Sequence, residues 1–564
     1  MKTTVHSEID AEIRIVSSLE KIFPDRKDYP CLKQLEALKG ERVHFQAVIV
    51  TQTPFQTVEL KVTGPLSGYA VIHEEVYLPC LTPAAPDDPD ILQSQSGLFP
   101  GPLLKGNLME LQAGCSHAFW VTLNIPAKCR PGRFSAGLNF RFTSSRTQPV
   151  QAKISLPVRI YDMILPRQKL CCEMWFHCDC LLNYYHVKCW SKRCWEILEN
   201  YFQDMAEHGV DTLLTPLWTP PLDTGKGKTR PTVQLLDIRK EGERYQFRFH
   251  RLKKWIDTAR KAGIRKFSFS HIFTQWGLAA APKISVRENG IEKDLFGWHV
   301  SADSEMYQSF LRQLFAALLP FLKRNKLTEK DVYFHLSDEP QEKHLEQYRK
   351  CSRFIHSLLK GFPTLDALSH VQYFDEGLVE CPVVNESRIE DFVDRTPRER
   401  WLYYCGEWEN HVPNRKFGMS SLRNRILGII LYLYRMDGFL EWGYNFWFSW
   451  ESEHQDLDPW SFRDILRIFG TSGAFAVLPG KNGRPVSTVH YEVFADALQD
   501  LRLLQLLETL IGRQQVEKLL NEGLKKMITI HDWPEDPSWF FRLRNRIIGI
   551  LAGKGISPGR KTNR

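Results

Sequence analysis

Apolar and polar residues alternate through much of the first third of the chain. Between about residues 41 and 160, apolar side chains recur at every second position in several short stretches, and turn signals such as Arg130-Pro131-Gly132 separate these stretches. Period two is typical of strands that bury one face. The clearest runs are Val43, Phe45, Ala47 and Ile49; Val58, Leu60 and Val62; Phe119, Val121, Leu123 and Ile125; and Ile154, Leu156, Val158 and Ile160. Together they predict a β-sandwich domain over residues 1–164.

The pattern changes near Leu165-Pro166, where short apolar stretches begin to alternate with long segments of helical periodicity. The expected strands are 170–177, 211–217, 266–272, 332–337, 366–371, 382–385, 401–406 and 439–445, and the clearest helices are 193–207, 305–323 and 491–509. Eight strands interleaved with helices predict a (β/α)8 barrel over residues 165–510. Because the segment between the fifth and sixth strands is short, an incomplete or distorted barrel is the alternative to a complete one. A short helical extension with a Gly- and Lys-rich tail is expected over residues 511–564.

Length and composition are those of a globular protein with two or three domains, since 43% of the 564 residues are hydrophobic and 25% are charged. The net charge of +8 lies mostly in short runs without interleaved aromatic residues, so we expect no nucleic-acid partner. The N-terminus lacks the apolar core of a signal peptide, and no apolar run is long enough for a membrane span. We therefore expect a cytoplasmic protein without a membrane partner. The sequence gives no prediction of the oligomeric state.

Cysteine spacing does not predict a metal centre. The chain has 13 cysteines, and six of them lie between Cys171 and Cys194 without any Cys-x-x-Cys pair. Those spacings fit no common zinc site, and buried thiols often act as small apolar side chains. We expect neither a metal nor another cofactor.

The candidate chemistry lies where the barrel strands end, because active residues of such barrels gather at the carboxyl ends of the strands. Carboxylates, amides and aromatic rings converge there, and this mixture suits a polyhydroxylated ring with polar edges and an apolar face. The side chains expected to bind substrate are Trp175, His177, Trp218, His271, Tyr373, Tyr404, Glu407, Trp408, Trp442, Tyr444, Asn445 and Trp447. The same strand ends also carry Asp179, Trp276, His370, Gln372, Asn385 and Tyr403.

The central motif is Asp338-Glu339-Pro340, directly after the fourth expected strand. Neighbouring side chains at a strand end diverge, so two adjacent carboxylates can reach different parts of one ligand. Repulsion between them should raise the pKa of one, as a general acid at neutral pH requires. Pro340 should keep Glu339 extended. The other interpretation is a helix N-terminus, where acidic residues satisfy free N–H groups. The position after an apolar strand favours a catalytic pair.

These residues resemble glycoside hydrolase family 123 over most of residues 30–510. The matching motifs are Gly40-Glu41-Arg42-Val43-His44-Phe45-Gln46, Leu336-Ser337-Asp338-Glu339-Pro340, Gly438-Phe439-Leu440-Glu441-Trp442-Gly443-Tyr444-Asn445 and Pro479-Gly480. The resemblance implies a sandwich followed by a barrel, and a retaining β-N-acetylhexosaminidase, with N-acetylgalactosamine as the expected sugar. It also implies that Glu339 is the acid/base, and that Asp338 orients the 2-acetamido group whose carbonyl oxygen acts as nucleophile.

Two alternatives stay open at this point. In a different retaining scheme Glu339 is the acid/base and Glu407 the nucleophile, which requires their carboxyl groups to lie about 5–5.5 Å apart. In the other alternative the chain binds a small glycoside or oligosaccharide without turnover, because a fold does not determine a function.

Overall fold

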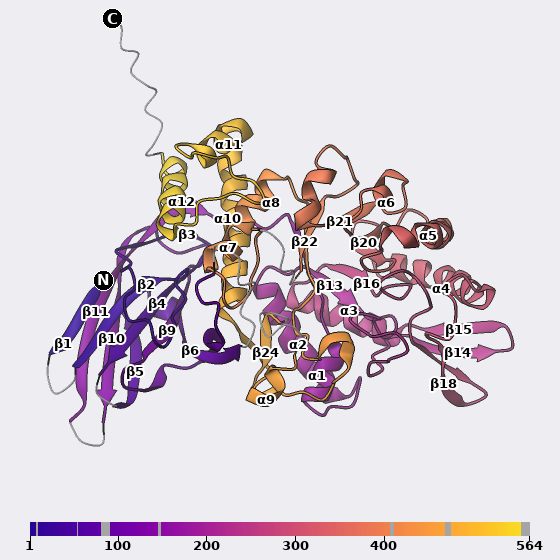
Figure 1. The fold of residues 1–564 in the computed structure, drawn as a ribbon, viewed down its shortest axis with the longest axis horizontal. Coiled ribbons are helices and arrows are strands. Elements are labelled where there is room, and N and C mark those ends of the chain that lie inside the picture. Colours follow the sequence, from indigo (N-terminus) through magenta and orange to yellow (C-terminus); the bar gives the residue numbers. More distant parts are fainter. Residues whose placement is uncertain are drawn as a thin grey trace, which may run out of the picture. The chain divides into compact units, whose positions relative to one another are not determined.

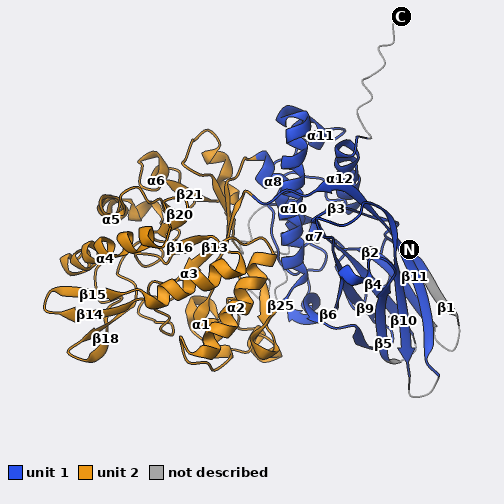
Figure 2. Ribbon diagram, turned by 180° about the vertical axis from the view of Figure 1, so that it is seen from behind, with its two compact units in different colours: residues 1–168, 410–433, 486–564 blue, residues 169–409, 434–485 orange. Residues whose placement is uncertain are grey.

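The computed structural model describes residues 1–6, 10–52, 55–80, 91–144, 148–405, 411–468 and 475–553. Its elements are labelled in Figure 1. By internal contacts the chain forms two compact units, shown in Figure 2. Unit 1 contains residues 1–168, 410–433 and 486–564, and unit 2 contains residues 169–409 and 434–485.

Unit 1 contains two sheets whose strands pair mainly in antiparallel fashion (Figure 1). One sheet has the order β1 (Lys2–His6), β2 (Asp10–Ser17), β4 (Arg42–Thr51), β9 (Ser116–Asn124), β6 (Ala70–Cys80), β7 (Gly97–Lys105). The other has the order β3 (Leu35–Lys39), β11 (Val150–Ile164), β10 (Gly132–Thr143), β5 (Phe55–Thr63), β8 (Leu108–Leu111).

One apolar core lies between these sheets, because alternate residues of both face it. Phe45, Ala47 and Ile49 of β4 belong to the same buried cluster as Leu156 and Val158 of β11. The period-two runs of the sequence therefore correspond to strands with one buried face, as a sandwich requires.

Eight short parallel strands of unit 2 form a closed barrel, in which each strand pairs with the next along the chain and the last pairs with the first. They are β12 (Cys171–Met174), β13 (Thr212–Thr215), β16 (Lys266–Phe269), β19 (Val332–His335), β20 (Thr364–Leu368), β21 (Cys381–Asn385), β22 (Trp401–Tyr404) and β23 (Gly438–Glu441). The prediction of eight barrel strands is confirmed, and the barrel is closed.

The helices that accompany the barrel strands are uneven in length. Those of unit 2 are α1 (Cys178–Tyr184), α2 (Lys192–Glu207), α3 (His250–Ala262), α4 (Glu305–Arg324), α5 (Leu345–Leu359), α6 (Gln372–Asp375) and α9 (Phe462–Ile465). After β20 there is only the one-turn α6, and after β21 only a 3-10 helix over Glu386–Phe392. The barrel is thus regular in its strands but not in its helices.

Unit 1 also contains helices from two later parts of the chain. They are α7 (Ser421–Arg425), α8 (Leu427–Leu433), α10 (Val489–Ile511), α11 (Arg513–Asn521) and α12 (Pro537–Leu551). The segment that joins β22 to β23 contains α7 and α8, and α10 packs against both of them. None of the helices in the described part of the chain is long and apolar enough to cross a membrane.

A second, small sheet interrupts the barrel unit and lies outside the barrel (Figure 1). Its order is β15 (Arg244–Arg248), β14 (Asp237–Glu241), β17 (Ile284–Glu288), β18 (Ile291–Phe296). The remaining short elements are β24 (Val477–Pro479), β25 (Pro485–Ser487) and the 3-10 helices Ser67–Tyr69, Glu342–His344, Trp450–Ser452 and Lys481–Gly483.

Candidate active site

Asp338 and Glu339 follow β19 at the carboxyl end of the barrel and are held by backbone hydrogen bonds from two sides. The Trp276 N–H donates to the Asp338 carbonyl oxygen at 2.8 Å, and the Glu339 N–H donates to the Ala367 carbonyl oxygen at 3.2 Å. The loop that follows β16 and the strand β20 thus fix the position of the pair. The Asp338 side chain is buried, whereas Glu339 is half-buried and reaches solvent.

Glu339 has an unusual backbone conformation. Its φ is +45°, in the left-handed region, so the expectation that Pro340 keeps it extended is wrong. A non-glycine residue in this region is strained, and such strain gathers at functional sites because surrounding contacts must maintain it. One of these contacts is a short hydrogen-bond chain: Asn385 Nδ2 donates to Tyr403 Oη at 3.1 Å, and Tyr403 Oη donates to Glu339 Oε1 at 2.6 Å.

The carboxyl of Asp338 is strongly perturbed by its surroundings. Burial raises the pKa of its carboxyl well above the usual range, and the neighbouring charges of Glu339, Asp366 and Asp223 raise this pKa further. Asp366 accepts hydrogen bonds from Tyr348 Oη and from the Ser337 N–H, and burial raises the pKa of Asp366 to about 7. In the protein without substrate, Asp338 is therefore favoured in its neutral form at neutral pH.

Asp223 is a further acidic residue at this site, and the sequence analysis missed it. It lies in the loop after β13, where burial raises the pKa of its carboxyl to about 6. Its Oδ1 accepts from the Glu451 N–H at 3.3 Å, whereas its buried Oδ2 has no hydrogen-bond partner among the described residues. The sequence interpretation of that strand end stopped at Trp218, five residues before Asp223 in the same loop.

Backbone strain concentrates in the loops around this acidic group. Within the described residues, the following have positive φ without being glycine and lie in these loops: Asp223 (+40°), Trp276 (+56°), Leu278 (+56°), Glu339 (+45°), Glu451 (+51°) and Ser452 (+54°). Conformations of this kind cost about 1–3 kcal/mol each and persist only where the surroundings hold them. Their concentration at one edge of the barrel supports a functional site there.

Aromatic and imidazole rings fill the centre of the barrel near its carboxyl end. The rings of His271 and His335 are stacked, with centroids 4.4 Å apart, and the Trp175 ring meets both edge-on. Trp175 Nε1 and both ring nitrogens of His271 are buried without a hydrogen-bond partner among the described residues. Burial, followed by the neighbouring His335, holds the pKa of His271 well below its usual range. His271 is therefore neutral, with one nitrogen able to donate and one able to accept.

Next to these rings, His177 takes part in a buried polar network. Arg230 donates from Nε and from Nη2 to the two carboxylate oxygens of Asp179 at 2.7 Å each, and it lies 3.1 Å from His177 Nδ1. Asn445 bonds the backbone of His177 in both directions, at 2.8 and 3.0 Å. Burial lowers the pKa of His177 to about 3. The network orders the loop after β12, and its polar atoms are already used within the protein.

Several other residues expected to bind substrate are buried with partners inside the protein. Their polar atoms bond as follows: Trp218 Nε1 to the His271 carbonyl (2.8 Å), Tyr373 Oη to the Gln341 carbonyl (2.7 Å), Tyr444 Oη to Asp204 (2.6 Å) and Trp447 Nε1 to the Val477 carbonyl (3.1 Å). The Tyr404 ring packs edge-on against Phe439, and the half-buried Trp442 packs against Phe446. Glu407 and Trp408 lie outside the described residues.

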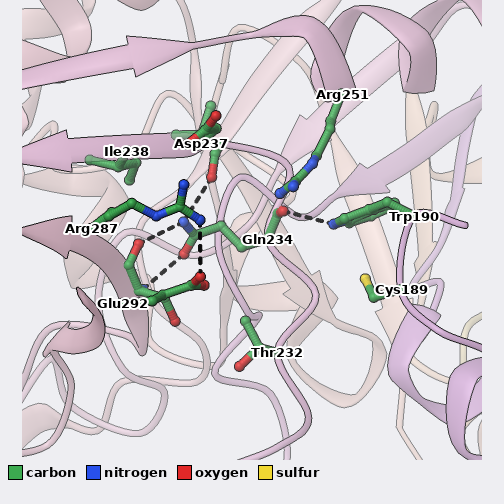
Figure 3. Close-up of a pocket in the computed structure, with 11 residues that line it drawn as sticks. Cys189, Trp190, Thr232, Gln234, Asp237, Ile238, Arg251, Arg287 and Glu292 are labelled. Atoms are coloured by element: carbon green, nitrogen blue, oxygen red, sulfur yellow. Dashed lines mark hydrogen bonds and ion pairs between the residues drawn. The ribbon is translucent and has the colours of Figure 1, made fainter. Parts of the chain in front are cut away.

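Two hollows are present on the same unit. One, of about 310 Å³, includes Thr224 and Thr274, and the Thr274 carbonyl accepts from Ser337 Oγ at 2.9 Å, directly before Asp338. The other, of about 220 Å³, lies between the segment after α1 and the small sheet (Figure 3). There Trp190 Nε1 donates to the Gln234 carbonyl at 3.0 Å. The lining residues of this second hollow are Cys189, Trp190, Thr232, Gln234, Leu236, Asp237, Ile238, Arg251, Ser285, Arg287 and Glu292.

The described residues contain no group of three or more histidine, cysteine, aspartate or glutamate side chains placed to hold a metal ion.

A closed parallel barrel with buried acidic residues at the carboxyl end of a strand has the features of a barrel enzyme, whose active site lies at that end. Residues 175–507, more than half of the chain, match the model of the glycoside hydrolase 123 catalytic domain. The chain belongs to glycoside hydrolase family 123, and it is a glycosidase that acts on a carbohydrate substrate. The resemblance inferred from the sequence motifs is confirmed.

A solved structure agrees with this assignment at the level of the fold. A family 123 glycoside hydrolase from Clostridium perfringens, solved in work on glycolipid glycan hydrolysis, is 14% identical and covers 96% of this chain and 99% of its own, with a TM-score of 0.73. A β-glucuronidase from Ruminococcus gnavus, 9% identical, covers 77% of this chain and 61% of its own at a TM-score of 0.25, too low to bear on the fold. Among curated proteins, none matches the chain.

Proposed function

We propose that this glycosidase removes terminal β-linked N-acetylhexosamine, with N-acetylgalactosamine as the preferred sugar, by a retaining and substrate-assisted reaction. Glu339 is the general acid and base, and Asp338 is the residue that faces the 2-acetamido group. The observation that carries the proposal is the pairing of a buried Asp338 with a solvent-reaching Glu339 fixed by Tyr403. Two adjacent carboxyl groups in such different surroundings suit two different roles.

The reaction follows from these surroundings. Glu339 donates a proton to the glycosidic oxygen while the acetamido carbonyl oxygen attacks C1, so the glycosidic bond breaks and an oxazolinium ring forms. When substrate binds, the proton of Asp338 passes to Glu339, and this is the proton that Glu339 donates. Ionised Asp338 then accepts a hydrogen bond from the acetamido N–H and balances the positive charge of the ring. Glu339 then takes a proton from water, which opens the ring at C1 with retained configuration. Burial of Asp338 makes this charge pairing stronger than it would be in water.

The test is a panel of 4-nitrophenyl glycosides that differ at C2 and C4. We expect release of nitrophenol from the β-2-acetamido galactoside, slower release from the gluco epimer, and none from the 2-hydroxy analogues. A thiazoline analogue of the oxazolinium should inhibit competitively. Failure of the wild-type protein to cleave any 2-acetamido glycoside contradicts the proposal.

Two variants assign the acid. Glu339→Gln should lower kcat at least about 100-fold while substrate binding remains, since general acid catalysis contributes about this much. The matched control is Glu342→Gln, because Glu342 is three residues away and its side chain is 79% exposed. Equal losses in the two variants contradict the role of Glu339.

The rival scheme with Glu407 as nucleophile predicts a different result. A 2-deoxy-2-fluoro glycoside should then leave a stable sugar ester on a peptide that contains Glu407, and the thiazoline should not inhibit. Under substrate assistance no such ester forms. For a natural substrate, the glycolipid glycan associated with the Clostridium perfringens relative is the first to test.

A further inference from the structure

Asp366 of β20 is a buried carboxyl group beside the acidic pair, and it takes no direct part in the proposed reaction. Its Oδ2 accepts hydrogen bonds from the Ser337 N–H at 3.1 Å and from the phenol of Tyr348. Both donors are neutral. Its Oδ1 is buried and has no hydrogen-bond partner among the described residues. A buried carboxylate without a cation beside it is costly in free energy, which makes the group a candidate for a functional role.

The hydrogen bonds alone do not require a carboxyl group at this position. Both donors bond the same oxygen of Asp366, so the single carbonyl oxygen of an asparagine side chain would accept them equally well. Asparagine would also avoid the burial of a charge. The feature that an aspartate adds is therefore its negative charge.

Strand β20 holds the backbone on both sides of Asp338. The Asp366 carboxyl group bonds the N–H of Ser337, the residue before Asp338. The next residue of β20, Ala367, accepts from the Glu339 N–H at 3.2 Å. These two bonds help to maintain the left-handed conformation of Glu339, whose φ is +45°. The charge of Asp366 thus belongs to the same structural element that positions the acidic pair.

The surroundings of Asp366 determine when it carries this charge. The titratable groups that face it are His335 of β19, Asp338 after β19, Tyr348 of α5 and Tyr373 of α6, and its neighbour on β21 is Pro382. Burial raises the pKa of Asp366 to about 7, although the hydrogen bond from Tyr348 and the charge of His335 oppose this rise. Asp366 therefore becomes ionised near neutral pH.

We propose that Asp366 is a positioning residue that holds the backbone beside Asp338 and, by its negative charge, makes the acidic pair keep the proton that Glu339 donates. This inference rests on the proposed function. A negative charge near a carboxyl group disfavours the loss of its proton. Because Asp366 is ionised only above about neutral pH, its charge acts on the alkaline side of the pH range and not on the acidic side.

The first test is the pH dependence of kcat/KM, which reports the ionisation of groups in the free enzyme. The substrate is a 4-nitrophenyl 2-acetamido glycoside. In Asp366→Asn the basic limb should move to lower pH by about one unit, the scale on which a neighbouring charge shifts a buried carboxyl group. The acidic limb should stay in place, because Asp366 of the wild-type protein is neutral there. A variant whose basic limb coincides with the wild-type limb refutes the proposal, whatever its rate.

Two further variants separate the effect of charge from structural damage. Tyr348→Phe removes the hydroxyl that favours ionised Asp366, so its basic limb should move in the same direction as in Asp366→Asn, and no further. The control is Asp211→Asn, since Asp211 precedes β13 and accepts from the Cys172 N–H at 2.8 Å near the amino end of the barrel. This control should leave both limbs where they are. An equal displacement in the control contradicts a specific role of Asp366.

A second readout does not depend on turnover. The infrared C=O stretch of a protonated carboxyl group can be assigned to Asp338 by its absence in Asp338→Asn. This band should disappear at lower pH in Asp366→Asn than in the wild-type protein. If the enzyme is active and the band titrates alike in both proteins, the inference is refuted while the proposed function stands. If the wild-type protein cleaves no 2-acetamido glycoside but the band shifts, the proposed function fails and the control of Asp338 by Asp366 is supported.

Discussion

Tyr403 is the residue that most directly controls where the acid lies. Its phenol donates to Glu339 Oε1 at 2.6 Å and accepts from Asn385 Nδ2 at 3.1 Å, so one hydroxyl links the strands β21 and β22 to the end of β19. The side chain is buried, and burial raises the pKa of Tyr403 well above its usual range. The charge of Glu339 and the hydrogen bond to it raise this pKa further. Tyr403 therefore stays protonated and acts as a fixed donor.

Tyr403→Phe should lower kcat about 10- to 100-fold, because a hydrogen bond to a charged group corresponds to roughly 1.5–3 kcal/mol and its loss leaves Glu339 free to turn away. Steady-state rates on a 4-nitrophenyl 2-acetamido glycoside measure this effect. The control is Tyr201→Phe, which removes another fully buried phenol, bonded to Tyr185 at 3.0 Å. A Tyr403→Phe enzyme with wild-type kcat contradicts a positioning role.

At the residue scale, a sequence can predict which side chains stand at strand ends but not which way they point. Asp338 and Glu339 were predictable because two carboxylates follow an apolar strand. Trp218 and Trp447 belong to equally plausible positions, yet their indole nitrogens donate to backbone carbonyls inside the protein. Asp223 was missed because it reaches the site through a loop fold that no periodicity encodes.

At the scale of elements, unit 1 is joined by a buried ionic network. Arg425 of α7 pairs with Asp496 and Asp500 of α10, and Asp500 also meets Arg544 of α12 at 3.3 Å. Arg544 in turn pairs with Glu41, the residue just before β4. Charged residues of the Gly40–Gln46 motif thus bind helices far away in the sequence. Arg42 pairs with Glu492 at 2.8 Å, and His44 Nε2 lies 3.3 Å from Asp496 Oδ1.

Glu41→Ala should destabilise unit 1 by about 3 kcal/mol, because it leaves the buried guanidinium of Arg544 without one of its carboxylates. Differential scanning calorimetry should show a clearly lower Tm. The matched control is Glu522→Ala, which removes the partner of Arg546, another arginine of α12. Both side chains of this pair are about half exposed, so the change should cost less than about 1 kcal/mol. Equal shifts in both variants would show that burial of the pair is unimportant.

At the scale of the whole molecule, the sequence predicted the eight barrel strands but not how distant segments associate. Periodicity is a local signal, so it identified the strands well and gave no sign that residues 410–433 and 486–564 share a contact unit with residues 1–168. The division into domains 1–164, 165–510 and 511–564 stays a prediction. Long helices such as α2 and α4 show helical periodicity in the sequence, whereas the one-turn α6 is too short to show it.

Buried titratable groups determine how the stability of the whole molecule responds to pH. Burial raises the pKa of Glu75 to about 8, despite the opposing charge of Lys21, and the pKa values of Asp366 and Asp223 are raised to about 7 and 6. These carboxyls hold protons in the folded state that they release in the unfolded state. Their contribution to the free energy of unfolding is therefore lost as the pH rises through the folded-state pKa. Buried histidines act in the opposite sense, because the pKa of His73 is lowered to about 4 by burial. Their contribution is lost only as pH falls below about 6.5.

Above about pH 7 the unfolded histidines hold few protons, so the carboxyl groups with raised pKa decide the sign of the slope. We therefore expect Tm to fall between pH 7 and 8, with each such carboxyl contributing at most about 1.4 kcal/mol per pH unit. Glu75 has both side-chain oxygens buried without a hydrogen-bond partner among the described residues, so Glu75→Gln should make the fall smaller. The control Glu110→Gln changes an exposed carboxyl of β8 and should leave the slope as it is. A Tm that is constant or rises from pH 7 to 8 would mean that these carboxyls are ionised in the folded protein, with solvent or cations reaching them.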